Sequence, residues 1–310
     1  MLPFLLLMVY LSVALSREAA KLTQPLDRVD GTRRRVATGF DPAVTRWGPG
    51  SLDWRAYERH YFTSVDSWVV VPLGGGRAVA VASYVGYRGF PVRRPYWKGV
   101  YVYHQDGTLE DLTPAQALHR PELVRSGRLC PEHLARQIAE AYRYRNADGD
   151  ATEVTDPPGN PQPYLTNAFD RQIRWVTVAH LPNHDRTIST IFLTDSTTGA
   201  TQVWRASPRD HLLSNDGAAD LARALRLQWR GCCDSDDNSY ELRRVTEARP
   251  VFARGQLYYL VAIVPTEWLD TTQPVDQTVL VDARRRRIVR VFDHADSEAD
   301  DALRAFFRGR

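Results

Sequence analysis

The sequence of 310 residues lacks several features that would assign it to a functional class. Its three cysteines, Cys130, Cys232 and Cys233, are too few for the disulfide framework of a small secreted domain, and no second pair completes a zinc site. The net charge of only +3 argues against a dedicated nucleic-acid-binding protein. With 43% hydrophobic residues, the composition is typical of a globular chain of about two or three compact units.

Motifs that would carry catalysis or nucleotide binding are also missing. The sequence has no Gly-x-Ser-x-Gly elbow, and no motif pairs a serine with a histidine and a carboxylate. Gly74, Gly75 and Gly76 lie between two expected strands without the lysine, serine or helix start of a phosphate-binding loop, so they indicate a hairpin tip. We therefore predict no catalytic residue and no cofactor. An envelope hydrolase with a site that sequence does not reveal stays open as the alternative.

Two histidines form the first candidate metal site. His180 and His184 have the i, i+4 spacing of a zinc pair, but Pro182 lies between them and they stand at the end of a strand. A zinc pair of this spacing needs a helix to bring both imidazoles to one face. We therefore expect solvated loop histidines here.

An acidic stretch forms the second candidate metal site. Asp234, Asp236 and Asn238 match positions 1, 3 and 5 of a calcium-binding loop. Ser239 and Val245 stand where that loop needs its glycine and its bidentate glutamate. The stretch therefore favours a solvated polar loop.

The first fifteen residues contain no charged side chain and form a membrane-seeking segment. As a helix the segment would cover about 24 Å of a hydrocarbon core roughly 30 Å thick, which favours a signal peptide, and Ala14 and Ser16 fit a cleavage site. The absence of a preceding Lys or Arg instead favours a truncated transmembrane helix. Both interpretations place the bulk of the chain outside the cytoplasm, anchored at the cell membrane. A buried N-terminal helix of a cytosolic protein is the third interpretation.

Three stretches of the remaining sequence share the pattern strand, turn, strand. They span residues 100–112, 191–204 and 279–292, and their first residues are 91 and 88 positions apart. An alternating apolar pair of strands precedes each stretch, so each unit is expected to be a four-strand antiparallel meander. Valines, aromatic and aliphatic residues alternate in these strands, which suits a sheet with at least one buried face.

Helices are expected before the first meander and after each meander. Ser51 is the predicted cap of a helix ending near residue 64, and Pro131 opens one ending near residue 146. Thr113, Pro114 and Gln116 form a capping box, Asn215 or Asp216 is expected to cap a helix, and Ser297 the last one. The sequence thus predicts an α+β fold of three tandem four-strand meanders, each packed with a helix.

Two passages carry a resemblance to a known family. One runs from VYVYHQDGTLEDL to AYRYRN, and the other comprises QPYL, WVTVAHLP, IFLTDSTTGATQVWR, RPVFARGQLYYLVAIVP and TVLVDARRRRIVRVF. Over roughly residues 60–300 the sequence resembles uncharacterised bacterial membrane-anchored proteins with repeated PepSY-like (cystatin-like) modules. It departs from them at RLQWRGCCDSDDNSYEL, where they have an apolar segment. The resemblance implies an extracytoplasmic, membrane-tethered domain and no particular reaction.

These observations define the expected organisation. A membrane-seeking segment over residues 1–16 and a linker over 17–50 precede α+β units over 51–146, 147–230 and 231–310. We expect a non-enzymatic binding, scaffold or regulatory protein of the bacterial envelope. A PepSY-type peptidase inhibitor is a specific version of this role.

Sheet edges and aromatic residues are the expected means of binding. The partner would be an envelope protein or a cell-wall polymer, contacted by sheet edges and by aromatic residues such as Trp97, Trp175, Trp204 and Tyr258, unless these pack in the core. Four arginines, 284–287, form a hairpin tip that is either a solvated turn or a phosphate-binding patch. The oligomeric state is open.

Overall fold

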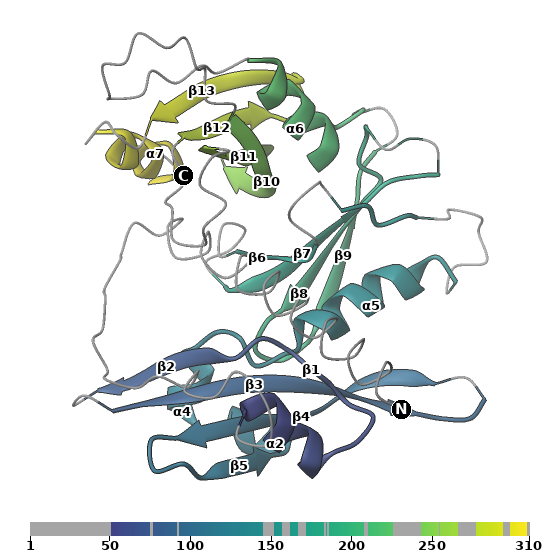
Figure 1. Ribbon diagram of the computed structural model, residues 1–310. Coiled ribbons are helices and arrows are strands. Elements are labelled where there is room, and N and C mark those ends of the chain that lie inside the picture. Colours follow the sequence, from purple (N-terminus) through teal and green to yellow (C-terminus); the bar gives the residue numbers. More distant parts are fainter. Residues whose placement is uncertain are drawn as a thin grey trace, which may run out of the picture.

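The computed structural model is an α+β protein with three antiparallel sheets (Figure 1), as the sequence predicts. It describes residues 51–74, 77–91, 93–144, 152–156, 162–166, 172–182, 184, 186–207, 210–225, 243–253, 255–265, 277–293 and 298–308. Within these ranges, no helix has the length and apolar character needed to cross a bilayer. The membrane-seeking segment, the linker, and the unit boundaries expected near residues 146 and 230 lie outside the described residues.

The first sheet has four rows made from five strands. The strands are β1 (Ser64–Val65), β2 (Val69–Gly74), β3 (Arg77–Arg88), β4 (Arg94–His104) and β5 (Leu109–Leu112). The long strand β3 pairs with β2 and then β1 along one edge and with β4 along the other, and β5 pairs with β4. The described part of the predicted glycine turn, Gly74, ends β2 opposite Arg77.

The second and third sheets are simple four-strand meanders. The second contains β6 (Tyr164–Thr166), β7 (Arg174–Ala179), β8 (Thr190–Asp195) and β9 (Thr201–Arg205). The third contains β10 (Arg243–Ala253), β11 (Gln256–Pro265), β12 (Gln277–Asp282) and β13 (Arg287–Asp293). Val100, Ile191 and Val279, from which the 91- and 88-residue spacings were measured, are fully buried on the third row of their sheets. The three predicted meanders are therefore confirmed.

Six helices accompany the sheets in the part of the chain that the structure describes. They are α2 (Leu52–Arg59), α3 (Pro114–Leu118), α4 (Pro121–Val124), α5 (Glu132–Tyr142), α6 (Asn215–Ala224) and α7 (Ala299–Arg308). The caps predicted at Ser51 and at Thr113 with Gln116 are confirmed. α2 ends earlier than expected because β1 begins at Ser64.

The caps predicted for α6, Asn215 or Asp216, are wrong by one or two residues. Ser214 is the N-cap, and its hydroxyl accepts from the backbone N–H of Gly217 at 3.1 Å. Asn215 instead lies inside the helix, and its amide donates to the hydroxyl of Tyr164 at 3.5 Å. Ser297, the predicted cap of α7, lies outside the described residues.

Both faces of the first sheet are covered. On one face, Ala56 of α2 packs against Tyr84 and Tyr101. On the other face, α3 and α4 contribute Ala117 and Leu123 to a cluster with alternate valines of β3 and β4. Because successive residues of a strand point to opposite faces, the aromatic and the valine positions serve different helices.

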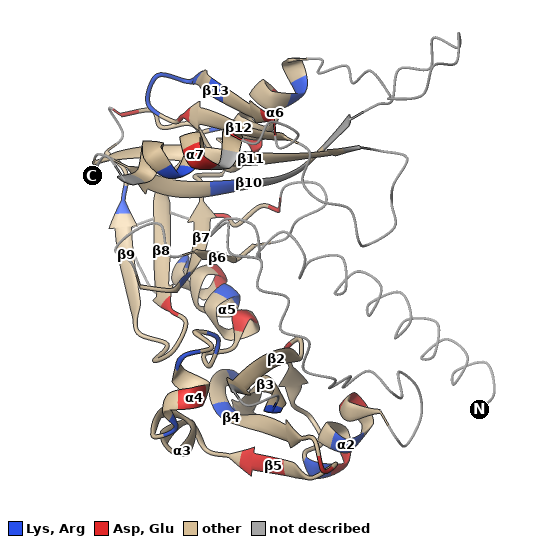
Figure 2. Ribbon diagram, turned by 90° about the vertical axis from the view of Figure 1, so that its left-hand side faces the viewer, with Lys and Arg blue, Asp and Glu red and all other residues tan. Residues whose placement is uncertain are grey.

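α5 lies between the first and second sheets, as two views of the molecule show (Figures 1 and 2). Leu134 and Ile138 pack toward the first sheet, with Trp97 as a neighbour. Ala139 and Tyr142 contact Phe192 on the second sheet. The helix that follows the first meander is therefore shared between two sheets.

α6 follows the second meander but packs on β10 and β11 of the third sheet, while α7 covers the opposite face of that sheet. The largest core joins the second and third sheets with α6, and it includes Val178, Ile191, Ala218, Val261 and Val279. The expectation that each sheet packs with a helix is therefore confirmed. In addition, α5 and α6 each bridge two successive sheets.

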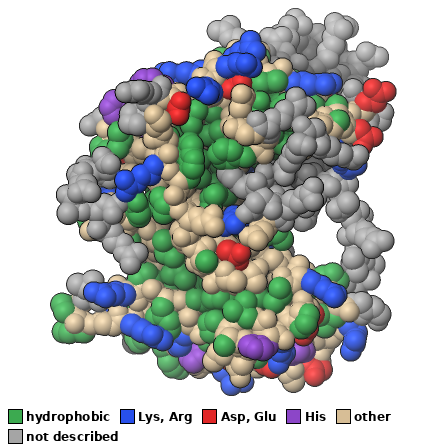
Figure 3. Space-filling model, turned by 180° about the vertical axis from the view of Figure 1, so that it is seen from behind, with side chains coloured by type: hydrophobic (Ala, Val, Ile, Leu, Met, Phe, Trp, Pro, Cys, Tyr) green, Lys and Arg blue, Asp and Glu red, His purple; other side chains and the backbone are tan. Residues whose placement is uncertain are grey.

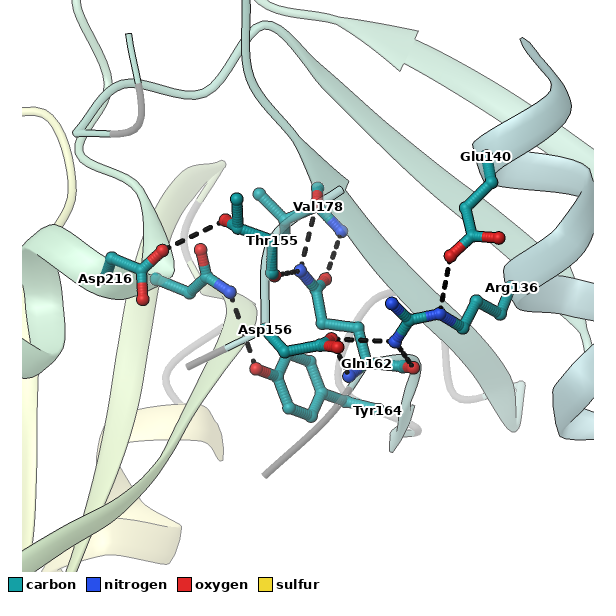
Figure 4. Close-up of polar contacts among 9 residues, drawn as sticks. Arg136, Glu140, Thr155, Asp156, Gln162, Tyr164, Val178 and Asp216 are labelled. Atoms are coloured by element: carbon teal, nitrogen blue, oxygen red, sulfur yellow. Dashed lines mark hydrogen bonds and ion pairs between the residues drawn. The ribbon is translucent and has the colours of Figure 1, made fainter. Parts of the chain in front are cut away.

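Hydrogen bonds, some of them buried, also connect the units (Figure 4). The side-chain amide of Gln162 donates to the carbonyl of Val178 at 3.1 Å and accepts from its N–H at 2.6 Å, as a paired strand would. The guanidinium of Arg136 on α5 donates to the carbonyl of Gln162 at 2.9 Å and to Asp156 at 2.7 Å. The hydroxyl of Thr155 donates to Asp216 of α6 at 3.0 Å. One polar network therefore links α5, the second sheet and α6.

Candidate functional site

The most prominent exposed feature of the first unit is a set of aromatic rings that we call the α2 surface: Trp54, Tyr57, Tyr61 and Phe62. Their exposed fractions are 43%, 52%, 60% and 81%, respectively. Ring centroids are 6.1 Å apart between Trp54 and Tyr57 and 5.0 Å between Tyr57 and Tyr61. The spacing of three residues places Trp54 and Tyr57 on one side of α2, opposite the buried Leu52 and Ala56. Tyr61 follows the end of α2 and contacts the ring of Tyr57.

Polar contacts hold the α2 surface in place. The indole N–H of Trp54 donates to Glu58 at 2.7 Å, one turn further along the helix. The guanidinium of Arg55 donates to the carbonyl of Gly107, in the β4–β5 turn, at 2.9 Å. Trp54 and Tyr57 are thus presented on a helix that is fixed to its sheet, and side chains of both charges border the rings.

A cluster of titratable residues lies at the end of α2. The Nε2 atom of His60 is 2.8 Å from Oδ2 of Asp111 on β5, and the hydroxyl of Tyr84 donates to Oδ1 of the same carboxylate at 2.8 Å. Tyr84 stacks on Tyr101 with 4.3 Å between ring centroids. Tyr101 in turn donates to the carbonyl of Ala56 in α2 at 3.2 Å.

The electrostatics of this cluster favour a positioning role. Burial raises the pKa of Tyr84 well above its ordinary value, and the hydrogen bond to Asp111 raises that pKa further. Burial likewise raises the pKa of Tyr101. Both phenols are therefore protonated at neutral pH and act as hydrogen-bond donors. A His60–Asp111 pair could orient a base, but a hydrolase also needs an activated nucleophile, and these phenols are not activated.

A second titratable group lies where α5 begins. Pro131 in the N-cap position offers no side-chain acceptor, and the carboxylate of Asp66 accepts instead from the backbone N–H groups of Glu132 and His133. Burial raises the pKa of Asp66 to about 6. Burial, with the charge of Asp66 adding to it, raises the pKa of Glu132 to about 7. Asp66 therefore ties the first sheet to α5 at the cost of burying a carboxyl group.

The candidate metal-binding histidines are not brought together as a site. His184 is exposed, as expected. His180 is not the expected solvated residue: it is buried, its backbone pairs with Glu153, and its Nδ1 lies 2.9 Å from the carbonyl of Leu181. Within the described ranges, no three His, Cys, Asp or Glu residues are grouped so that they could hold a metal ion. The second candidate, Asp234, Asp236 and Asn238, lies outside the described residues, as do Cys232 and Cys233.

The aromatic residues singled out from the sequence serve packing. Trp175 is buried and donates from its indole to the carbonyl of Cys130 at 2.9 Å. Trp204 packs against Phe252, and Tyr258 against Phe306. Trp97 packs beside α5.

The aromatic residues of the α2 surface were not singled out from the sequence, although a signal for them exists. The helix predicted after Ser51 places Trp54, Tyr57 and Tyr61 on one side. The arginine tip is as predicted, because Arg284, Arg285 and Arg286 are exposed between β12 and β13.

Comparisons of this chain with protein-family models, with curated proteins and with solved structures returned no match.

Proposed function

We propose that the protein is a non-enzymatic scaffold of the bacterial envelope, tethered to the membrane by its N-terminal segment, and that the α2 surface binds a protein partner. The observation that carries the binding role is the exposure of Trp54, Tyr57, Tyr61 and Phe62 on α2 and the turn that follows it, with α2 hydrogen-bonded to its sheet. Exposed aromatic clusters of this kind mark interaction sites more often than solvated surface. The PepSY-like character of the units remains part of this proposal, on the strength of the sequence resemblance.

The chemistry of the α2 surface fits a protein better than a cell-wall polymer. Tyrosine and tryptophan present a large apolar ring with a polar end, and they lose little conformational freedom on binding. Charged residues of both signs, including Asp53, Glu58 and Arg59, surround the rings. An aromatic centre with a mixed polar rim is the usual arrangement of a protein–protein interface.

Site-specific photocrosslinking tests the partner. A photoreactive phenylalanine analogue replaces Tyr57 in the full chain in its native host, and the same analogue at Tyr144, which is 77% exposed outside the α2 surface, is the control. We expect one discrete adduct from position 57 and none of that mass from position 144. The partner identified by mass spectrometry must then bind the purified chain, and Tyr57→Ser with Tyr61→Ser must weaken that binding by about tenfold or more. Equal crosslinking at both positions, or unchanged binding, would reject the proposal.

Cell fractionation with mapping of the true N-terminus tests the tether. We expect the chain in the membrane fraction, with the α+β units accessible to protease from outside the cytoplasm. A soluble cytosolic chain beginning at Met1 would reject the localisation. His60, paired with Asp111, is the described residue best placed to act as a base, so an enzymatic activity abolished by His60→Ala and kept by Tyr57→Ser would favour the hydrolase alternative.

A further inference from the structure

The paired ends of β3 and β4 form a two-stranded arm that projects beyond the first sheet (Figure 1). β1 and β2 together pair with β3 only as far as Val85, and β5 pairs with β4 only from Val100 onward. Past these points Gly86, Tyr87 and Arg88 pair solely with Tyr96, Pro95 and Arg94 of the same hairpin. The arm thus carries its side chains away from the body of the unit, where hydrophobic and basic atoms gather on a protrusion (Figure 3).

The arm is basic and carries no acid. Residues 86–96 contain three Arg and not one Asp or Glu. Arg88 and Arg94 stand directly opposite each other in the register, an arrangement of like charges that destabilises a hairpin. Arg88 lies 3.8 Å from the ring centroid of Tyr96, and Lys98 of the same strand adds another positive charge. The hairpin therefore presents a positive charge that an external anion would relieve.

The end of the arm is apolar. Phe90 is 97% exposed, the highest exposure among the large hydrophobic residues in the described ranges, and the exposed Pro91 follows it. Arg88 and Arg93 flank the tip, and Tyr87 is partly exposed behind it. From the tip inward, the arm thus has an apolar end (Phe90 and Pro91), then arginines (Arg88, Arg93 and Arg94), then tyrosines (Tyr87 and Tyr96).

We propose that this arm docks on an anionic lipid bilayer, with Phe90 entering the acyl region and Arg88, Arg93 and Arg94 binding headgroup phosphates. The order of side chains along the arm matches the order of layers in a bilayer surface, where the hydrocarbon lies beneath the phosphates and aromatic residues favour the interface. Guanidinium groups suit phosphate because they donate two parallel hydrogen bonds. A soluble anionic polymer would satisfy the arginines but offers no apolar layer for Phe90. The arm shares no residue with the α2 surface, so the failure of either test leaves the other proposal standing.

A fluorescent label at the tip tests the docking. Cys232 and Cys233 are replaced by Ser, Phe90→Cys is labelled with an environment-sensitive nitrobenzoxadiazole in the full chain, and the buried Cys130 stays unlabelled. The labelled chain is mixed with vesicles of phosphatidylglycerol and phosphatidylcholine, or of phosphatidylcholine alone. We expect a blue shift, and quenching by nitroxide lipids, with the anionic vesicles only. The same label at Tyr144→Cys reports general proximity to lipid and is expected to stay aqueous.

Paired arginine variants give the matched control. Arg93→Gln with Arg94→Gln is expected to lower the ratio of inserted to free label about tenfold to thirtyfold, because each basic residue near an anionic surface contributes to binding. Arg286→Gln with Arg287→Gln, which removes the same charge from the β12–β13 tip, is expected to leave the ratio unchanged. An aqueous label at position 90 with anionic vesicles would overturn the proposal. So would a blue shift produced by soluble polyphosphate and absent with vesicles, or equal effects of the two arginine pairs.

Discussion

Replacing Asp66 by Asn is expected to remove much of the pH dependence of stability in the first unit. In the folded chain burial raises the pKa of Asp66 from 3.8 to about 6, although two backbone N–H groups of α5 donate to its carboxylate. The folded state therefore holds this proton more tightly than the unfolded state does. The resulting stability is fully present below pH 3.8 and is lost as the pH rises through about 6.

The size of the effect follows from the shift in the pKa. A shift of about two units corresponds to about 3 kcal/mol in total, of which about 1.4 kcal/mol is lost between pH 5 and pH 8. The side chain of Asp66 is only 12% exposed, so solvent screens this cost little. Burial raises the pKa of Glu132 to about 7, so Glu132 also lowers the free energy of unfolding as the pH rises. Because its side chain is 32% exposed, solvent screens the charge and the contribution of Glu132 is smaller.

Urea unfolding followed by tryptophan fluorescence at pH 5, 6, 7 and 8 measures the dependence, with a constant denaturant slope as the check on cooperativity. Asp66→Asn keeps one acceptor for the helix terminus and carries no charge. Between pH 5 and pH 8, its free energy of unfolding should therefore decrease by about 1.4 kcal/mol less than that of the unmodified chain. Asp106→Asn is the control, because a hydrogen bond from Thr108 lowers the pKa of Asp106 and moves its titration below this window. A wild-type pH profile in Asp66→Asn would refute the reasoning.

Two further predictions concern buried groups. Burial raises the pKa of Cys130 to about 12, so iodoacetamide at pH 8 should modify it only after unfolding, as peptide mass spectrometry would reveal; rapid native labelling would contradict its position. Gln162→Ala should lower the free energy of unfolding by about 2 to 4 kcal/mol, because it leaves both main-chain groups of Val178 without their partner. The exposed Gln202→Ala should change it by less than about 0.5 kcal/mol, and similar losses from the two variants would refute the role of Gln162.

The sheets were predictable because the alternation of apolar and polar residues within each strand is a local sequence pattern. Alternation around Val100, Ile191 and Val279 determines strands and faces without knowledge of the rest of the chain. The cap of α6 was missed because Ser214 and Asn215 are both good cap residues, and a contact with Tyr164, distant in sequence, takes the second one.

The site was less predictable because burial is set by partners far along the chain. His180 forms a β-bridge with Glu153, and no local sequence pattern predicts this pairing. Trp175 and Trp204 look like binding residues in the sequence. In the structure, however, Trp175 is buried and bonded to the carbonyl of Cys130, and Trp204 packs against Phe252 of the third sheet. The exposed rings of Trp54 and Tyr57 could have been found, because a helical projection from Ser51 separates them from Leu52.

The sharing of helices between successive sheets has a consequence for how the chain matures. α5 precedes β6–β9 in the sequence, and α6 precedes β10–β13. Because a chain is synthesised from its N-terminus, each bridging helix is made before the later of the two sheets that it contacts. When each of these sheets forms, the helix that covers it has already been synthesised. The apolar face of the sheet is therefore exposed to solvent only briefly, which limits aggregation. The order of elements thus suits a chain that folds gradually from its N-terminus as it is synthesised.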